Sequence, residues 1–199
     1  MRLERGSLNR SVKVVVVVLV ILLAGVAGRN LIRAEDSPAL KKMVQPRYVE
    51  GTQLVLPEGY REWIFVGASL GLSYSEQPRA GGPGTFAHIY IQPEAYGHFK
   101  QTGQFPEGTM LVMEVHRPEQ NVSINKQGYF EGDRVAVEVA LKDRSKFEEG
   151  WAYFDFANGT KKSSTAFPKA SCFSCHQQHG ADDNVFTQFY PVLRDLKKK

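Results

Sequence analysis

The two cysteines of this chain stand three residues apart, in the segment Cys172-Phe173-Ser174-Cys175-His176. No further thiol exists for a structural disulfide or for a four-thiolate zinc site. The spacing Cys-x-x-Cys-His is typical of c-type haem attachment. Two thiols at this spacing on a helix can each bond one vinyl group of a porphyrin, and the adjacent imidazole can then ligate the iron. The motif therefore predicts one covalent haem c, held by Cys172 and Cys175, with His176 as the proximal iron ligand.

Two other interpretations of the motif are weaker, and they stay open. A thioredoxin-like dithiol is expected after a strand in a βαβ unit, whereas this motif follows an irregular segment rich in Lys, Ser, Thr and Pro. A structural zinc site needs further ligands at finger-like spacing. His179 offers one such ligand, but no second partner stands nearby in the sequence.

The first 34 residues have the pattern of an export signal. Residues 1–13 are basic, and the uncharged run Val14–Gly28 follows them. A basic region before a short apolar region is typical of a signal peptide, and this run is shorter than the ~20 residues of a spanning helix. Two arginines follow closely, so an uncleaved inner-membrane anchor with its N-terminus inside the cell is the alternative. We expect residues 35–199 to form a single domain in a bacterial periplasm.

The net charge of +4 belongs mainly to this leader. Residues 1–34 hold six basic residues and one acidic residue, so residues 35–199 hold 25 − 6 = 19 basic and 21 − 1 = 20 acidic residues. No basic patch with interleaved aromatic residues is present, and we therefore expect no nucleic-acid partner. Contact with a membrane is expected only through the N-terminal segment, if it is uncleaved.

Short strands dominate the predicted elements of the exported part. Strands are expected at residues 61–67, 86–91, 109–116, 129–141 and 151–156, a helix at residues 93–100, and two helical pieces at residues 170–195, interrupted by Gly180 and Pro191. This pattern predicts an α+β fold, mainly an antiparallel β-sheet with a few short helices, with the haem attached on the C-terminal helix.

Alternation along the strands suggests a pocket. Val135, Val137, Val139 and Leu141 form an apolar face, while Arg134, Ala136, Glu138 and Ala140 are expected on the opposite face. Glu138 would thus be a carboxylate between two alanines, with space above it; the alternative is a solvent-facing glutamate on an edge strand. Met113 on the preceding strand is either core packing or an axial iron ligand. The remaining histidines, His88, His98, His116 and His179, are expected to be strand or surface residues.

Several further segments, taken in order with the haem motif, resemble the cytochrome P-460 family, which includes the cytochromes c′-beta. The matching segments are Tyr60-Arg61-Glu62-Trp63 with Val66-Gly67, Ile89-Tyr90-Ile91-Gln92-Pro93-Glu94-Ala95-Tyr96, Thr102-Gly103-Gln104-Phe105-Pro106-Glu107-Gly108-Thr109, Gly128-Tyr129-Phe130-Glu131-Gly132-Asp133 and Asn184-Val185-Phe186-Thr187-Gln188-Phe189-Tyr190-Pro191-Val192-Leu193-Arg194. The resemblance covers nearly all of residues 55–196.

The resemblance implies a mostly antiparallel β-fold, a homodimer and one haem per chain. Some members oxidise hydroxylamine, and nitric oxide with it, and in those a lysine is cross-linked to a porphyrin meso carbon. Met113 matches that lysine and Ala87 matches near a distal arginine, whereas the distal acid is kept as Glu138. The c′-beta branch also lacks the cross-link. Resemblance to this branch implies a five-coordinate haem that binds nitric oxide under aromatic side chains. Phe86 is the local candidate for that cap, with sheet core as its alternative.

The first hypothesis for the function is a haem iron that binds or oxidises small nitrogen species. His176 would be proximal, Phe86, Ala87 and Met113 would line the distal side, and Glu138 would serve as an acid or base. Hydroxylamine oxidation is in doubt because Met113 cannot form the nitrogen–carbon cross-link. The second hypothesis is an electron-transfer cytochrome with His176 and Met113 as axial ligands. A small gaseous or nitrogenous ligand and a redox partner protein are the partners that we expect. A haem-bearing subunit docked to another exported protein is a third, less supported hypothesis.

Overall fold

The structure, a computed structural model, describes residues 40–74 and 81–198. These residues belong to one compact unit, Pro38–Lys199. The predicted signal peptide or anchor, residues 1–34, lies outside the described residues, and its assignment stays a prediction. Within the described ranges, no helix combines the length and the apolar character that a membrane span requires.

Five antiparallel strands form the main sheet, in the order β3-β4-β5-β6-β7. Their bounds are β3 (Ile64–Leu70), β4 (Phe86–Ile91), β5 (Met110–Glu119), β6 (Phe130–Lys142) and β7 (Trp151–Asp155). A smaller antiparallel sheet contains β1 (Tyr48–Val49), β2 (Gln53–Val55) and β8 (Ser163–Ser164) in the order β1-β2-β8. The predicted mainly antiparallel α+β fold is confirmed. The sequence does not predict the small sheet, because strands of two or three residues are too short to show alternation.

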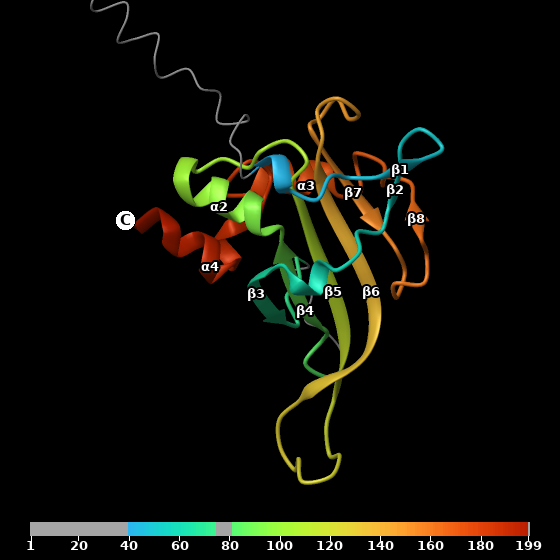
Figure 1. The fold of residues 1–199 in the computed structure, drawn as a ribbon. Helices are drawn as coiled ribbons and strands as arrows, with labels where there is room; N and C mark the ends of the chain where they lie inside the picture. Colours follow the sequence, from blue (N-terminus) through green and yellow to red (C-terminus); the bar gives the residue numbers. More distant parts are fainter. Residues whose placement is uncertain (1–39, 75–80, 199) are drawn as a thin grey trace, which may run out of the picture. The chain divides into compact units, whose positions relative to one another are not determined.

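The helices gather near one end of the main sheet, around α2 (Pro93–Thr102), α3 (Phe173–His179) and α4 (Pro191–Arg194) (Figure 1). The structure also has 3-10 turns at η2 (Leu40–Lys42), η3 (Tyr60–Glu62), η4 (Thr187–Phe189) and η5 (Asp195–Lys198). Helix α2 begins at Pro93 and ends before Gly103, as predicted. Pro191 does not interrupt a helix as expected; it begins α4, because proline suits the first helical position.

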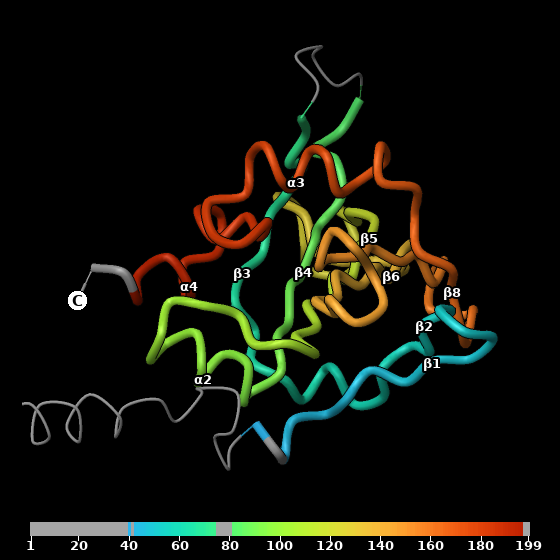
Figure 2. The backbone as a smooth tube through the Cα atoms, turned by 90° about the horizontal axis from the view of Figure 1, so that it is seen from above, coloured from blue at the N-terminus to red at the C-terminus, as the bar shows by residue number. Residues whose placement is uncertain are grey.

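The first strand of the main sheet begins later than predicted. Gly59 has a left-handed φ of 68°, which starts the turn η3, and the Trp63 N–H closes that turn on the Tyr60 carbonyl. The first residues of the strand predicted at residues 61–67 therefore belong to a turn, and β3 starts at Ile64. The C-terminal segment lies beside β3: α4 contacts this strand, and Figure 2 shows the segment curving past the strands.

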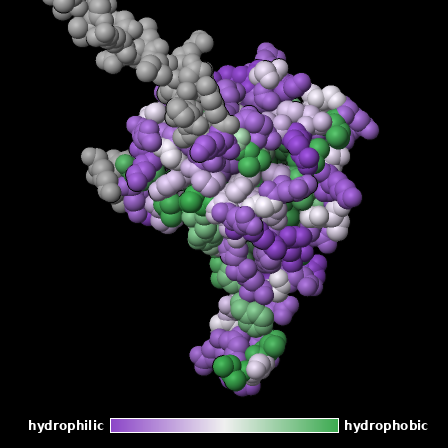
Figure 3. Space-filling view, in the orientation of Figure 1, coloured by the Kyte–Doolittle hydropathy of each residue, from purple (hydrophilic) through white to green (hydrophobic). Residues whose placement is uncertain are grey.

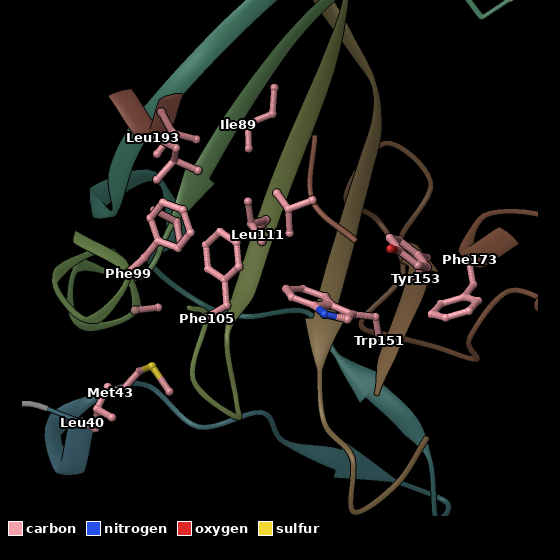
Figure 4. Packing of buried hydrophobic residues seen from close by; sticks show 14 residues of the cluster. Leu40, Met43, Ile89, Phe99, Phe105, Leu111, Trp151, Tyr153, Phe173 and Leu193 are labelled. Atoms are coloured by element: carbon pink, nitrogen blue, oxygen red, sulfur yellow. The ribbon is translucent and has the colours of Figure 1, made fainter. Parts of the chain in front are cut away.

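The main sheet carries one buried cluster on each face, because successive side chains of a strand point to opposite sides. On β5, Leu111 joins the cluster on the helical side, whereas Met110 and Val112 join the other. Figure 4 shows the helical-side cluster, in which Phe99 and Phe105 pack close to Leu111. The rings of Phe99 and Phe105 stack with centroids 4.3 Å apart. This packing holds α2 against the helical face of the main sheet.

Strand β6 has the predicted apolar face at Val137, Val139 and Leu141, all buried in the second cluster. The prediction for Arg134 is wrong. The pairing of β5 with β6 shifts between Val115 and His116, where an extra residue reverses the facing of the chain. Arg134 therefore points to the face opposite Glu138, where its guanidinium donates a hydrogen bond to Glu114.

The hairpin of β5 and β6 extends away from the helices (Figure 1). Its tip is partly apolar in the space-filling view (Figure 3), and Val122, Ile124 and Tyr129 are exposed there. Ile124 has a relative exposure of 93%. The tip therefore contributes little to either buried cluster of the chain.

Candidate functional site

The motif from the sequence lies at a mainly apolar cavity of about 270 Å³ on the helical face of the main sheet. Two rows of cross-strand neighbours contribute to the floor. Ile89, Met113 and Glu138 are paired in one row, and Leu111, Ala140 and Tyr153 in the next. All six side chains belong to the same face because pairing preserves facing across an antiparallel sheet. The cavity is thus bounded by the sheet on one side and by the C-terminal segment on the other.

Both thiols of the motif line this cavity. Cys172 precedes the first residue of α3 and Cys175 lies within it, so the two are three residues apart on one helical face. Both cysteines are free thiols and are partly buried. Burial raises the pKa of the Cys172 thiol, and the nearby charges of Glu138 and Cys175 raise it further. The two thiols therefore lie at the same cavity wall without forming a disulfide.

His176 also lines the cavity, and its imidazole is fixed on three sides. Its Nδ1 lies 2.8 Å from the backbone carbonyl of Asn184. Since a carbonyl can only accept, Nδ1 carries the proton, which leaves the Nε2 lone pair free to bind a metal. The rings of Tyr153 and Phe186 lie on either flank, each with its centroid 4.3 Å from that of His176. Burial lowers the pKa of His176, although the hydrogen bond to Asn184 opposes the shift, and so favours the neutral ring that ligation needs.

Next to Asn184 lies a partly buried ion pair that sequence reasoning did not find. Lys142, at the end of β6, has a side chain only 6% exposed, and its Nζ lies 2.6 Å from Asp183 Oδ2. Trp151 Nε1 donates a hydrogen bond to the other carboxylate oxygen of Asp183. Asp183 and Asn184 have φ values of 45° and 63°, a left-handed conformation that these two residue types tolerate. No sequence signal links Lys142 to this loop, because the two are far apart along the chain.

Glu138 and Met113 lie at the cavity, as predicted. Glu138 is not on an edge strand, since β6 lies between β5 and β7. Burial raises the pKa of its carboxyl group, and the charge of its cross-strand neighbour Asp155 raises it further. Met113 lines the cavity and also packs against the helical-side cluster, so its side chain serves the core whether or not it binds iron.

Phe86 and Ala87 are not among the described residues that line the cavity. Unbroken pairing of β4 with β5 puts Phe86 on the same face as Tyr90, on the side of the second cluster. Ala87 faces the helical side and packs against the first cluster instead. Four other aromatic residues, Tyr74, Tyr153, Phe186 and Tyr190, line the cavity. Only Phe186 and Tyr190 had a sequence signal, since they belong to the C-terminal segment of the resemblance.

The donor set fits haem c better than either alternative. Two free thiols and a neutral imidazole share one mainly apolar wall. A small metal ion requires ligand atoms that lie close together. In the described part of the chain, these three residues do not form a group whose ligand atoms all lie within 4.8 Å of one another. The motif also follows an antiparallel sheet rather than the βαβ unit of a thioredoxin-like dithiol.

The chain matches the family model Cytochrome P460 over residues 57–187, which is well over half of its 199 residues. A search of curated proteins found no match. The chain belongs to the cytochrome P460 family, as the sequence resemblance indicated. Membership makes it a haem-binding cytochrome, and the cavity beside the Cys-x-x-Cys-His motif is the candidate haem site.

Proposed function

We propose that this chain is an exported cytochrome with a single haem c, attached through Cys172 and Cys175 and ligated by His176, which binds or oxidises small nitrogen species such as nitric oxide and hydroxylamine. The observation that carries the proposal is that both thiols and the imidazole line one cavity. Bound there, the haem would supply an iron with an open position for a small ligand. The basic and apolar leader supports export to the periplasm, with a membrane anchor as the alternative.

The residues around the cavity suit a small uncharged ligand. Its lining is mainly apolar and includes four aromatic side chains. Activation of a peroxide calls for polar groups aimed at the departing oxygen, and the cavity offers few of them. His176 is held by the Asn184 carbonyl, so the orientation of its ring does not depend on the ligand. These features favour the binding of a diatomic molecule.

Glu138 is the residue that can move a proton at this site. Its carboxyl group lies on the cavity floor, and its raised pKa makes the ionised form a better proton acceptor than an exposed glutamate. It can take a proton from hydroxylamine bound in the cavity. Met113 offers a thioether where hydroxylamine-oxidising relatives have the cross-linking lysine, so ligand binding has more support than oxidation.

Nitric oxide titration of the haem-matured protein tests this proposal. We expect the Soret band to shift with one equivalent of nitric oxide per chain, and the haem to remain with the protein in acidified acetone. The double variant Cys172→Ser/Cys175→Ser should release its haem in acetone, whereas Ser174→Ala, between the two thiols, should retain it. A Soret band that ignores nitric oxide, or haem that is extracted from the unaltered protein, would contradict the proposal.

A second function is supported by the position of Met113 in the same cavity. Its sulfur could serve as the sixth iron ligand of an electron-transfer cytochrome. Met113→Leu removes the sulfur and keeps the bulk of the side chain. If Met113 binds iron, this variant should change from a low-spin to a high-spin spectrum. An unchanged spectrum would reject this function.

The proposal includes two protein partners. A redox partner is needed for electron transfer or for oxidation of a nitrogen species, and the family resemblance implies a homodimer. Light scattering of the haem-matured protein should give twice the mass of one chain. A monomer would remove the dimer from the proposal without affecting the haem site.

A further inference from the structure

A second cluster of metal-binding side chains lies on the face of the main sheet opposite the haem cavity. His88 on β4, His116 on β5 and Glu131 on β6 each offer one ligand atom, and these atoms lie within 4.8 Å of one another. His88 directly precedes Ile89, which lines the haem cavity, so alternation sends His88 to the other face. The cluster is thus separated from the candidate haem site by the sheet.

The sequence predicts His116 as a surface residue, and this prediction is wrong. Strand β5 continues beyond the predicted end to Glu119, which leaves His116 inside the paired sheet with a side chain only 13% exposed. Its Nδ1 lies 3.0 Å from the Gly132 carbonyl and must be the donor, because the carbonyl can only accept. Its Nε2 is buried and has no hydrogen-bond partner. The ring is therefore held as the tautomer whose free lone pair is available to a cation.

The other two side chains of the cluster complete a two-histidine, one-carboxylate set. His88 Nε2 lies 2.8 Å from Glu131 Oε1, and the rings of His88 and His116 have centroids 5.9 Å apart. The side chain of His88 is 16% exposed, whereas that of Glu131 is 40% exposed. The histidines are thus largely shielded from water, and the carboxylate gives solvent a route to them.

Glu131 brings one carboxylate to the cluster, and a second carboxylate, that of Glu114, lies next to His116. Glu114 Oε1 accepts hydrogen bonds from Tyr60, Arg61 and Arg134, which leaves Oε2 as the oxygen nearer His116. This Oε2 lies 3.7 Å from His116 Nε2, too far for a hydrogen bond. A cation at Nε2 would have the carboxylate of Glu131 as a ligand, whereas the charge of Glu114 is already balanced by Arg61 and Arg134.

From this geometry we propose a second, non-haem metal site in which His88, His116 and Glu131 bind a divalent first-row transition metal ion such as Zn²⁺. Tetrahedral zinc with bonds of about 2.0–2.1 Å holds its ligand atoms about 3.4 Å apart, so side-chain rotation has to close the widest gap by roughly 1 Å. The proton that His88 shares with Glu131 leaves Nε2 for Nδ1 or for solvent as the metal binds. Three protein ligands leave the fourth position to water or to another ligand.

The metal would join three neighbouring strands near the base of the long hairpin. Because it binds the folded chain through residues far apart in sequence, it would stabilise the fold in proportion to the logarithm of its concentration. This role does not rest on the haem proposal, since none of the three ligands lines the haem cavity.

Calorimetric titration of the haem-loaded, chelator-treated protein with ZnCl₂ tests the site. We expect one Zn²⁺ per chain, an increase in the melting temperature, and an X-ray absorption spectrum with two imidazole nitrogens at the zinc. His116→Gln and, separately, His88→Gln should each weaken binding at least tenfold and abolish the thermal shift. His179→Gln is the matched control, because its exposed side chain lies on α3, outside the cluster.

Each outcome decides for or against the site. Binding that survives both histidine variants, or a protein that binds no Zn²⁺, would overturn the proposal. If His116→Gln fails to fold, His88→Gln carries the test, because His88 is the more exposed of the two rings. A loss of affinity confined to His179→Gln would also overturn it, because the zinc would then lie near the haem motif.

Discussion

Glu114 should contribute strongly to stability although it lies away from the haem cavity. Its side chain is 4% exposed, and its Oε1 receives hydrogen bonds from Tyr60, from Arg61 Nε at 2.9 Å and from Arg134 Nη1 at 2.9 Å. Burial alone would raise the pKa of Glu114, but these donors lower it from 4.5 to about 2. This lowering of the pKa corresponds to about 3 kcal/mol of stability at neutral pH.

The sign of the pH dependence follows from the lowered pKa. The folded chain holds Glu114 ionised at pH values where the unfolded chain would protonate it, so the stabilisation is complete above about pH 4.5. It is lost as the pH falls from about 4.5 to about 2. Glu114→Gln should lower the free energy of unfolding by about 3 kcal/mol at pH 7, and its stability should depend less on pH across this window. Breaking a buried ion pair costs a similar amount, about 3–5 kcal/mol.

Denaturant unfolding of the haem-loaded protein, followed by circular dichroism with a chelator present, measures this difference. The chelator separates the effect from any metal at His116. Glu119→Gln is the matched control, because it removes an exposed carboxylate from the same strand. A loss below 1 kcal/mol in Glu114→Gln, or an acid dependence identical to that of the unaltered protein, would refute the reasoning.

Two further changes probe the haem side of the sheet. Lys142→Met should cost about 1–2 kcal/mol in denaturant unfolding, less than the loss of a fully buried ion pair, because the Asp183 side chain is 29% exposed. It should also broaden the spectroscopic signature of the His176 ligand; equal stability would show that the pair does not hold the Asn184 loop. The rate of reaction with hydroxylamine should rise through the pKa of Glu138, which burial and Asp155 move above 4.5. Asp155→Asn should move this limb of the pH–rate profile to lower pH and Glu138→Gln should remove it, whereas a profile unchanged in both variants would exclude Glu138 as the base.

Sequence patterns predicted the main sheet well because its strands are long enough to show alternation. The bounds of β4 agree with the prediction, and the apolar face of β6 was predicted correctly at Val137, Val139 and Leu141. The facing of Arg134 could not be predicted, since a bulge in the pairing with β5 reverses it and bulges leave little trace in hydrophobic periodicity.

The candidate site was predictable where it depends on a local motif or on one strand. Cys172, Cys175 and His176 are adjacent in sequence, and Glu138 follows from alternation. The Lys142–Asp183 pair and the cluster of His88, His116 and Glu131 depend on contacts between distant segments. Phe86 was expected at the pocket, but only strand pairing reveals which face of the sheet it occupies.

We infer that His176 ligates the iron of a haem bound in the cavity, and that no second side chain ligates it. The most direct measurement is the absorption spectrum of the haem-matured protein, ferric and dithionite-reduced, with and without carbon monoxide. We expect a high-spin spectrum that shifts when carbon monoxide binds the reduced iron. A low-spin spectrum that carbon monoxide leaves unchanged would contradict it, and would indicate a sixth protein ligand, with Met113 as the first residue to replace.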